Sequence, residues 1–409
     1  MTSTLSVAPV VNAANGGPAD EHSEWVRQAR EVADILAADA LERDRANLEP
    51  VAEAGLLRRA GLPALLVPRS LGGAGQTWRT ALAVVREIAA ADGSIAQLLG
   101  YHYVNSSNLW LVGGASVQEL LGRGTAEHQW LWGDSVNPVE PDLSLTPDAG
   151  CGYRLNGKKS FATGASVGDM IAATGAVTSS GELLLVAVPA GDPGISFGGD
   201  WDNLGQRLSA SGSVSYSDVR IEPEHVIGSL DADKVTPLAS AITPAIQAVF
   251  GHLYLGIAEG ALAAARDYTR SVSRPWVLSG HGAAVDEPYV LAAYGDHVAR
   301  LAAVAALASQ VADELTAALA RGASLTWSER GALAASVAAL KVVATDVALD
   351  VTSSIFEVTG ARATSNARGF DRFWRNVRTH TLHDPVAYKR REVGDYYLTG
   401  RTPEFTLYT

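Results

Sequence analysis

Several classes of protein are excluded by what the chain lacks. Cys151 is the only cysteine among 409 residues, so no disulfide can form within the chain and a cytoplasmic location is expected. The surrounding DAGCG segment has no histidine close by in sequence, and we do not expect Cys151 to act as a nucleophile. Acidic residues outnumber basic ones, 44 to 32. A net charge of −12 without a basic cluster argues against a nucleic-acid partner.

Long uninterrupted apolar segments are also missing. Charged residues interrupt the Ala-rich stretches, so no transmembrane helix and no membrane partner are expected. Residues 1–20 have no basic start followed by an apolar block. They are predicted to be a flexible tail rather than a signal peptide.

The rest of the chain changes its hydrophobic period twice, which predicts three domains. From residue 21 to 128 the apolar residues recur at helical spacing, with Val26, Ala29, Val32, Ala33 and Leu36 on one stripe. Further helices are predicted over residues 48–60, 78–91 and 95–111.

Residues 129–236 show a period of two, which is typical of strands. The segment GYRLNGKKSFAT alternates around Asn156-Gly157, and this pair predicts a hairpin turn. ELLLVAVPA and SGSVSYSDVRI predict two further strands. Short strands between Gly, Pro and Asp turns favour a small antiparallel barrel or sandwich.

From residue 237 to 409 the pattern is helical again. Three long segments carry Ala at helical spacing, which suits the closely packed antiparallel helices of a bundle. A last helix is predicted over Val386–Tyr397. The fold class predicted from this order is α+β.

Motifs along the chain resemble those of the acyl-CoA dehydrogenase superfamily. The match runs from about Glu21 to Tyr397 and includes AGLLRRAGLPALLVPRSLGGAGQTW and LGQRLSASGSVSYSDVRI. More narrowly, REIAAADGS, GYHY, SRPW and FDRFWRNVRTHTLHDPVAYK resemble the dibenzothiophene monooxygenase branch, with its indole-oxygenating and N-hydroxylating relatives.

This resemblance implies a fold and an activity. The fold would have an N-terminal helical domain, a middle β-barrel or sandwich and a C-terminal four-helix bundle. The enzyme would be a two-component monooxygenase, which takes reduced flavin (FADH2 or FMNH2) from a separate flavin reductase. It would use O2, through a flavin C4a-hydroperoxide, to oxygenate an indole-like or thiophene-like aromatic heterocycle. The family also implies a homotetramer, with a dimer as the alternative.

The carboxylate base of a dehydrogenase is missing at both places where this superfamily puts it. His383-Asp384-Pro385 stands where a Tyr-Glu-Gly motif would fall, and Asp384 is one methylene shorter than Glu. The other window, LASAITPAIQAVFGHLYLGIA, contains no carboxylate. General-base catalysis contributes roughly 10²–10⁴-fold, so this loss argues against dehydrogenation.

Histidines take the place of that base. By resemblance His383 would stabilise or protonate the flavin–oxygen adduct, His102 would face the substrate and His380 would contact the cofactor. An imidazole that titrates near neutral pH suits such proton control. His380 and His383 are three residues apart and could share a metal ion, but no further ligand motif accompanies them and no metal is expected.

The resemblance also implies a set of flavin contacts. Phe161 in SFATGAS would pack on the isoalloxazine ring, and the Thr163 hydroxyl would reach the region of flavin N5. Ser209 and Ser211 in RLSASGS would bind the ribityl or phosphate part. Arg274, from a neighbouring subunit, and Arg362 would hold the flavin phosphate through bidentate contacts.

Two departures from the branch concern the substrate. Asp134 in GDSVN stands where the branch has Asn in a G-N-A-S segment, and Thr163 replaces a Ser. An ionised Asp accepts hydrogen bonds only, which favours a substrate with an N–H group such as an indole. The predicted pocket is aromatic; its candidates are Tyr101, Tyr103, Trp130, Trp132, Trp201 and Trp276.

Two alternatives stay open at the level of sequence. The chain could be an acyl-CoA dehydrogenase with Asp384 as an unusual base. It could also be a catalytically inactive relative that serves as a binding subunit.

Overall fold

The computed structural model describes residues 19–141, 143–406, 408 and 409. Its first part is helical. The helices are α1 (Ala19–Ala37), α2 (Ala40–Ala46), α3 (Val51–Arg59), α4 (Trp78–Ala91), α5 (Gly93–Leu111), α6 (Ala115–Val117) and α7 (Arg123–His128). The predictions over residues 48–60, 78–91 and 95–111 are confirmed as α3, α4 and α5. The predicted tail lies outside the described residues up to residue 18, and α1 already begins at Ala19.

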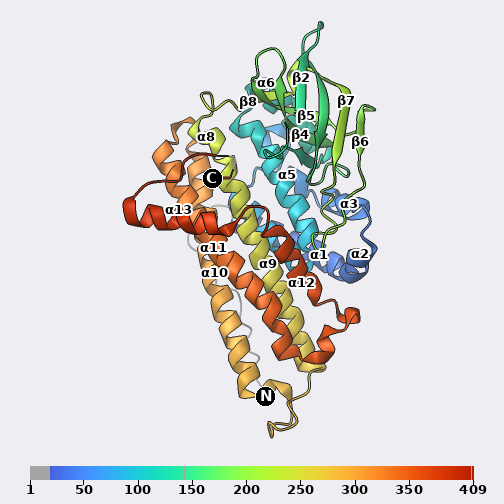
Figure 1. Cartoon of the computed structure of the whole chain (residues 1–409), viewed down its shortest axis with the longest axis vertical. Helices are drawn as coiled ribbons and strands as arrows, with labels where there is room; N and C mark the ends of the chain where they lie inside the picture. The colour runs from blue at the N-terminus through green and yellow to red at the C-terminus, as the bar shows by residue number, and fades with distance from the viewer. Residues whose placement is uncertain (1–18, 142, 407) are drawn as a thin grey trace.

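The middle part is one mixed sheet (Figure 1). Its strands are β1 (Trp132–Ser135), β2 (Leu143–Pro147), β3 (Tyr153–Lys159), β4 (Met170–Val177), β5 (Leu183–Pro189), β6 (Ile195–Phe197), β7 (Val214–Ile221) and β8 (Val226–Ser229). The order is β6-β7-β3-β2-β4-β5-β8, and β1 pairs with β4. The prediction of a purely antiparallel sheet is wrong, because β4 pairs in parallel with both β1 and β2.

The hairpin predicted at Asn156-Gly157 is also misplaced. These residues lie inside β3, where the pairing with β7 shifts register between Leu155 and Gly157, which marks a bulge. Gly157 takes a φ of 130°, which a glycine adopts without steric cost. The turn between β2 and β3 is made by residues 148–152 instead, with Cys151 at a φ of 70°.

The last part is a helical bundle. Its helices are α8 (Pro237–Ser240), α9 (Ile242–Ser271), α10 (Pro288–Ala320), α11 (Trp327–Thr359), α12 (Asp371–His380) and α13 (Val386–Thr399). Small residues allow close packing. A Cβ on Gly256 or Gly260 would meet the backbone oxygen of Arg86 or Ala90 in α4 at 2.3 and 1.9 Å. The predicted last helix is confirmed as α13, and the α+β class is confirmed.

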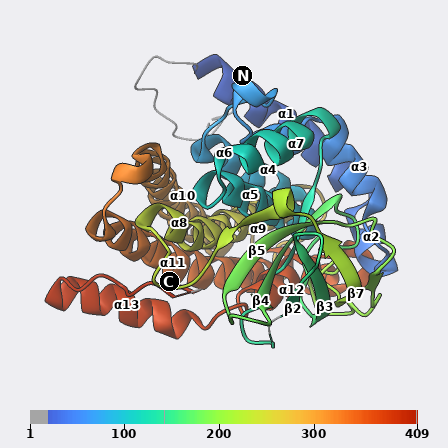
Figure 2. The same ribbon diagram turned by 90° about the horizontal axis from the view of Figure 1, so that it is seen from above.

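Helix α5 joins the three parts. Every residue from Gly93 to Leu109 is buried, because α5 packs against β1 on one side and against α4 and α9 on another. Its first turn is capped by Asp92, whose carboxylate accepts the N–H groups of Ser94 (3.0 Å) and Ile95 (3.3 Å). Figure 2 shows α5 and α9 between the sheet and the outer bundle helices. Residues on α5 can therefore face both the sheet and the bundle.

Within the described part of the chain, three helical segments are long and apolar enough to cross a membrane by length and composition alone: Pro237–Ser271, α10 and α11. Length and composition therefore do not exclude a membrane span, contrary to the argument from interrupted apolar runs. The apolar windows of the first and third are 72% and 61% buried inside the protein, whereas that of α10 is only 17% buried. Helix α10 thus carries a largely uncovered apolar face.

Candidate active site

A chain of hydroxyl groups lies between the sheet and α5. Thr163 Oγ1 is 2.8 Å from Ser211 Oγ, which is 2.7 Å from Ser209 Oγ. From α5, Gln97 donates its amide N–H to Thr163 Oγ1 at 3.3 Å. All four residues are buried, and Gln97 Oε1 has no hydrogen-bond partner among the described residues. The structure therefore brings together three of the predicted flavin contacts and leaves a buried polar atom beside them.

The backbone around these hydroxyls is strained. Phe161, Gln206 and Ala210 have φ values of 56°, 53° and 49°, in the left-handed region where a side chain costs roughly 1–2 kcal/mol. Such residues cluster at functional sites and persist only when the surroundings fix them. Phe161 is 62% exposed, although it is a large apolar side chain, and its ring lies 5.9 Å from that of Trp201. An exposed aromatic ring held in this way is available to a planar ligand.

Asp134 lies on β1, beside the hydroxyl chain. Its Oδ1 accepts the backbone N–H of Thr163 at 3.1 Å, and the two backbones pair again through Asp134 N–H to Thr163 O at 3.0 Å. Burial without a cationic partner among the described residues raises the pKa of Asp134 to about 8. At pH 7 the side chain is therefore mostly a neutral acid. This corrects the expectation of an acceptor only, because a protonated carboxyl can also donate.

The second group of residues stands at the C-terminal end of α12. His380 is buried, and its Nδ1 lies 2.9 Å from the hydroxyl oxygen of Tyr254 on α9. His380 Nε2 has no partner among the described residues. Burial, together with the charges of His383 and Lys341, holds the pKa of His380 well below its ordinary value. His380 is therefore a neutral imidazole with one free nitrogen.

His383 contacts a buried ion pair, Asp384 and Lys341, and forms a triad with it. His383 Nδ1 lies 3.1 Å from Asp384 Oδ1, and Lys341 Nζ of α11 forms an ion pair with the same oxygen. Burial raises the pKa of Asp384, but the hydrogen bond from His383 and the charge of Lys341 outweigh it and hold that pKa well below its ordinary range. Burial lowers the pKa of Lys341 to about 8, against the pull of Asp384. The triad is thus an ionised pair that holds an imidazole.

Aromatic rings connect the two groups. The Tyr101 ring of α5 lies 6.1 Å from His380 and 6.5 Å from His383. Phe250 of α9 stacks on Tyr101 at 6.1 Å and contacts both histidines, at 4.6 and 4.9 Å. Burial and then the charges of Asp134, Tyr254 and Asp384 raise the pKa of Tyr101 well above 10. Tyr101 therefore packs against both histidines and lies within electrostatic range of Asp134.

His102, Tyr103 and Trp132 do not fit their predicted roles. Trp132 N–H donates to His102 Nδ1 at 3.0 Å, so Nε2 carries the proton and donates to the Pro63 carbonyl at 2.9 Å. Both nitrogens are used, and burial lowers the pKa of His102 to about 4. Tyr103 donates to the Leu62 carbonyl, and Trp132 Nε1 donates to Thr125. All three are fully buried and hold α5 and β1 in place, without a free polar group for a substrate.

The two predicted phosphate ligands lie elsewhere. Arg274 and Arg362 are exposed, in the segments that follow α9 and α11, at the end of the bundle away from the sheet (Figure 1). Trp276 is exposed in the same region. No described contact within the chain joins these residues to Thr163, Ser209 and Ser211. Trp130 instead lines a surface cavity of about 650 Å³ with Asp169, Phe197 and His225, and none of the residues described above lines that cavity.

Sequence reasoning missed Gln97, Phe250, Tyr254 and Lys341. Lys341 carried the clearest indication, since a lone cation in the Ala-rich segment AASVAALKVVATD needs a buried partner. The other three stand at ordinary helical positions, and only the packing of α5 on α9 shows their role. Among the described residues no group of three or more His, Cys, Asp and Glu could hold a metal ion.

Comparison with known proteins places this arrangement in a family. Residues 19–121 match the model of the acyl-CoA dehydrogenase N-terminal domain, and residues 248–387 that of the acyl-CoA dehydrogenase C-terminal domain. The dibenzothiophene monooxygenase of Rhodococcus qingshengii is 41% identical over 391 residues, which cover 92% of this chain and 94% of that protein. The chain belongs to the acyl-CoA dehydrogenase family, in its dibenzothiophene monooxygenase branch.

Other members of this branch share nearly the whole chain. The probable FMNH2-dependent monooxygenase SfnC of Pseudomonas putida is 40% identical over 384 residues, covering 93% of this chain and 96% of that one. The complex of TdsC from Paenibacillus sp. A11-2 with FMN and indole superposes with a TM-score of 0.91 at 38% identity, over 94% of this chain and 100% of that one. Methanesulfinate monooxygenase MsuC of Pseudomonas fluorescens gives 0.90 at 39%, over 94% and 99%. The predicted family, fold and flavin-dependent monooxygenase class are confirmed.

Proposed function

We propose that this chain is the oxygenase component of a two-component system that oxygenates a small aromatic heterocycle, indole-like or thiophene-like, with reduced flavin and O2. The observation that carries the proposal is the free nitrogen on each of His380 and His383, whose rings pack on Tyr101 and Phe250, in a chain that also holds a buried group of hydroxyls at Thr163. A separate flavin reductase would supply the reduced flavin. The relative SfnC, named as FMNH2-dependent, and the FMN complex of TdsC support FMN.

The residues present fit a flavin. The exposed Phe161 ring, the Thr163 and Ser211 hydroxyls and the free Gln97 Oε1 offer one aromatic face and several hydrogen-bonding groups on one side of α5. The flavin would supply the activation of O2. These side chains would orient it and exclude water from its reactive edge. Arg274 and Arg362 stay proposed phosphate ligands, with Arg274 supplied by a second subunit.

His383 is suited to control a proton at one atom. Because Asp384 is ionised and accepts only, His383 Nδ1 carries the proton of their hydrogen bond and Nε2 is left free. The Lys341–Asp384 pair fixes the ring orientation, as an acidic partner does for catalytic histidines. His383 is about one-third exposed at its side chain, so Nε2 can exchange a proton with a ligand or with solvent.

The dehydrogenase alternative lacks a base. Asp384 is occupied by Lys341 and His383, and its depressed pKa makes it a weak proton acceptor. Asp134 is mostly protonated at neutral pH. Neither carboxyl is poised to abstract a proton, which a dehydrogenase requires. Two free imidazole nitrogens in a preserved site also argue against an inactive binding subunit.

The substrate pocket is proposed from Asp134, Tyr101 and Phe250, with Trp201 beside Phe161. Two aromatic rings suit a flat apolar substrate, and a neutral Asp134 can pair with an N–H or with an acceptor atom. In the TdsC complex the bound heterocycle is indole.

We also propose assembly into a homotetramer, or a dimer, in the cytoplasm. The uncovered apolar face of α10 and the exposed residues Trp276, Val277, Leu278 and Tyr289 beside it support burial against sister subunits. Light scattering of the purified protein tests the oligomeric state.

The function is tested by an aerobic assay with a flavin reductase, NADH and FMN. Indole, dibenzothiophene and methanesulfinate are supplied in parallel, and products and peroxide are measured. Oxygenated indole or dibenzothiophene is the expected result. Turnover of methanesulfinate alone would overturn the aromatic substrate but keep the class. Anaerobic bleaching of bound flavin by an acyl-CoA, with no oxygenated product, would favour the dehydrogenase.

A further inference from the structure

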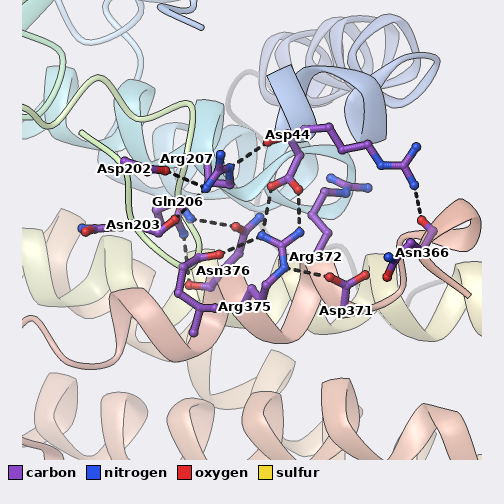
Figure 3. Close-up of polar contacts among 12 residues, drawn as sticks. Asp44, Asp202, Asn203, Gln206, Arg207, Asn366, Asp371, Arg372, Arg375 and Asn376 are labelled. Atoms are coloured by element: carbon purple, nitrogen blue, oxygen red, sulfur yellow. Dashed lines mark hydrogen bonds and ion pairs between the residues drawn. The ribbon is translucent and has the colours of Figure 1, made fainter. Parts of the chain in front are cut away.

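The loop that carries Ser209 and Ser211 is fastened to the helix that ends in His380. Figure 3 shows the polar network, which joins α2, residues 202–207 and α12. At its centre the backbone N–H of Gln206 donates to Asn376 Oδ1 at 2.8 Å, and Gln206 Nε2 donates to the Asn376 carbonyl at 3.4 Å. Asn376 is buried, one helical turn before His380.

Gln206 transmits this contact to the hydroxyl groups. Its carbonyl accepts three hydrogen bonds: from Ser209 N–H at 3.2 Å, from Ser209 Oγ at 2.8 Å and from Trp201 Nε1 at 2.7 Å. Ser209 Oγ then contacts Ser211, and Ser211 contacts Thr163. Gln206 therefore links the two through its own backbone: Asn376 holds its N–H, and its carbonyl, in the next peptide group, orients Ser209 and the Trp201 ring that lies beside Phe161.

The conformation of Gln206 needs an external hold. A left-handed φ of 53° is unfavourable for glutamine, and it persists only where neighbouring groups over-determine it. The loop backbone also lies directly on α12, because a Cβ on Gly205 would meet the Arg375 carbonyl at 2.1 Å. Arg375 adds an outer clamp, donating to the Leu204 carbonyl at 2.8 Å and pairing with Asp44. Only Asn376 holds the N–H of Gln206 itself.

We propose that Asn376 is a positioning residue, which holds the hydroxyl chain at Ser209 and Ser211 in register with the histidines at the end of its own helix. The inference rests on the proposed function. In the described contacts Asn376 touches neither the proposed cofactor site nor the triad of His383, Asp384 and Lys341. It therefore acts through Gln206. The physical need is a fixed spacing between the groups that bind flavin and the group that controls the proton, since a small misplacement uncouples such reactions.

The test compares three variants. Asn376→Leu keeps the branched side-chain shape but removes the acceptor, Asn376→Asp keeps an oxygen acceptor, and Glu357→Ala, on α11, is the control. Glu357 is exposed and lies outside the network that fastens the loop. The readouts are hydrogen exchange of the amides of residues 205–211, the Kd for reduced FMN under anaerobic conditions, and product against peroxide with indole.

In Asn376→Leu we expect amide exchange at 205–211 to rise about tenfold, because the buried N–H donor of Gln206 loses its hydrogen-bond partner. The exchange of the α11 amides should not change. Product per NADH should fall about tenfold while peroxide rises, and the Kd for reduced FMN should rise less. Asn376→Asp should restore most of the coupling, and Glu357→Ala should match the parent protein.

Unchanged exchange at 205–211 and unchanged coupling in Asn376→Leu would overturn the proposal. The proposal would also fail if Asn376→Asp and Asn376→Leu lost coupling equally while amide exchange at 205–211 stayed slow. That outcome would give Asn376 a role other than accepting the Gln206 N–H. If the parent protein itself oxygenates none of the test compounds, the substrate proposal fails. Exchange and FMN binding then still decide the positioning role.

Discussion

The two sides of the candidate site are built in opposite ways. On the sheet side, neutral hydroxyls from Thr163, Ser209 and Ser211 are held by backbone in unfavourable left-handed conformations. On the bundle side, regular helices bring a buried ionised pair, Lys341 and Asp384, against His383. The first side is suited to recognise a shape and the second to hold a charge. A flavin monooxygenase needs both, because binding the cofactor and managing its protons are separate tasks.

The largest effect is expected from removing the imidazole on the bundle side. In His383→Ala the binding of reduced FMN should change little, because the hydroxyl side is intact. Product formation should fall about 100-fold or more, the size of a lost proton-transfer group, and peroxide should accumulate instead. Product and peroxide assays check this. His281→Ala, which removes an exposed histidine from the segment after α9, is the control. Full coupling in His383→Ala would separate His383 from the chemistry.

The charged pair can be broken from one side. Lys341→Met leaves Asp384 buried without its cation, and about 3–5 kcal/mol of unfolding free energy should be lost, as for other broken buried pairs. Adding Asp384→Asn should return most of that stability, because no charge is then buried, but not the coupling. Urea unfolding of the single and double variants measures their stability, and the product and peroxide assays measure their coupling. Equal stability of Lys341→Met and the parent protein would contradict a buried ion pair.

The neutral acid on the sheet side predicts a pH dependence. The pKa of Asp134 is raised by burial, so the folded state keeps a proton that the unfolded state releases above about pH 4. Its stabilising contribution is complete below that pH and is lost as the pH rises through about 8, at up to about 1.4 kcal/mol per pH unit. The parent protein should therefore lose stability relative to Asp134→Asn between pH 5 and 8. Unfolding curves measure this difference. The same difference in stability between the two proteins at pH 5 and at pH 8 would show that Asp134 is ionised in the folded protein.

On the bundle side, sequence patterns predicted the positions of the helices better than the chemistry of their side chains. Helical spacing was enough to locate α4, α5 and α13, and the resemblance placed His380 and His383 at the end of a helix. It could not show that Lys341, some forty residues earlier, ionises Asp384 and thereby removes it as a base. Contacts between separate helices leave no period in the sequence.

On the sheet side the patterns failed for a different reason. Asn156-Gly157 is a good turn pair, but the buried Leu155 and the pairing with β7 keep it inside a strand as a bulge. His102 was placed correctly on an N-terminal helix, yet its two nitrogens serve the backbone of Pro63 and Trp132. Whether a polar side chain faces a ligand or the chain itself depends on the packing of distant segments.

The smallest effect is expected at the junction of the hydroxyl chain, Thr163. In Thr163→Val the β-branched shape is kept, but Gln97 and Ser211 lose the oxygen that they share. Each lost hydrogen bond is worth about 1 kcal/mol, so the Kd for reduced FMN should rise about fivefold to tenfold, and the peroxide fraction should change little. Thr163→Ser restores the hydroxyl and should bind FMN as the parent does, which separates the oxygen from the methyl group. Anaerobic fluorescence titration measures both constants. Uncoupling in Thr163→Val with unchanged FMN affinity would mean that the sheet side, too, takes part in the chemistry.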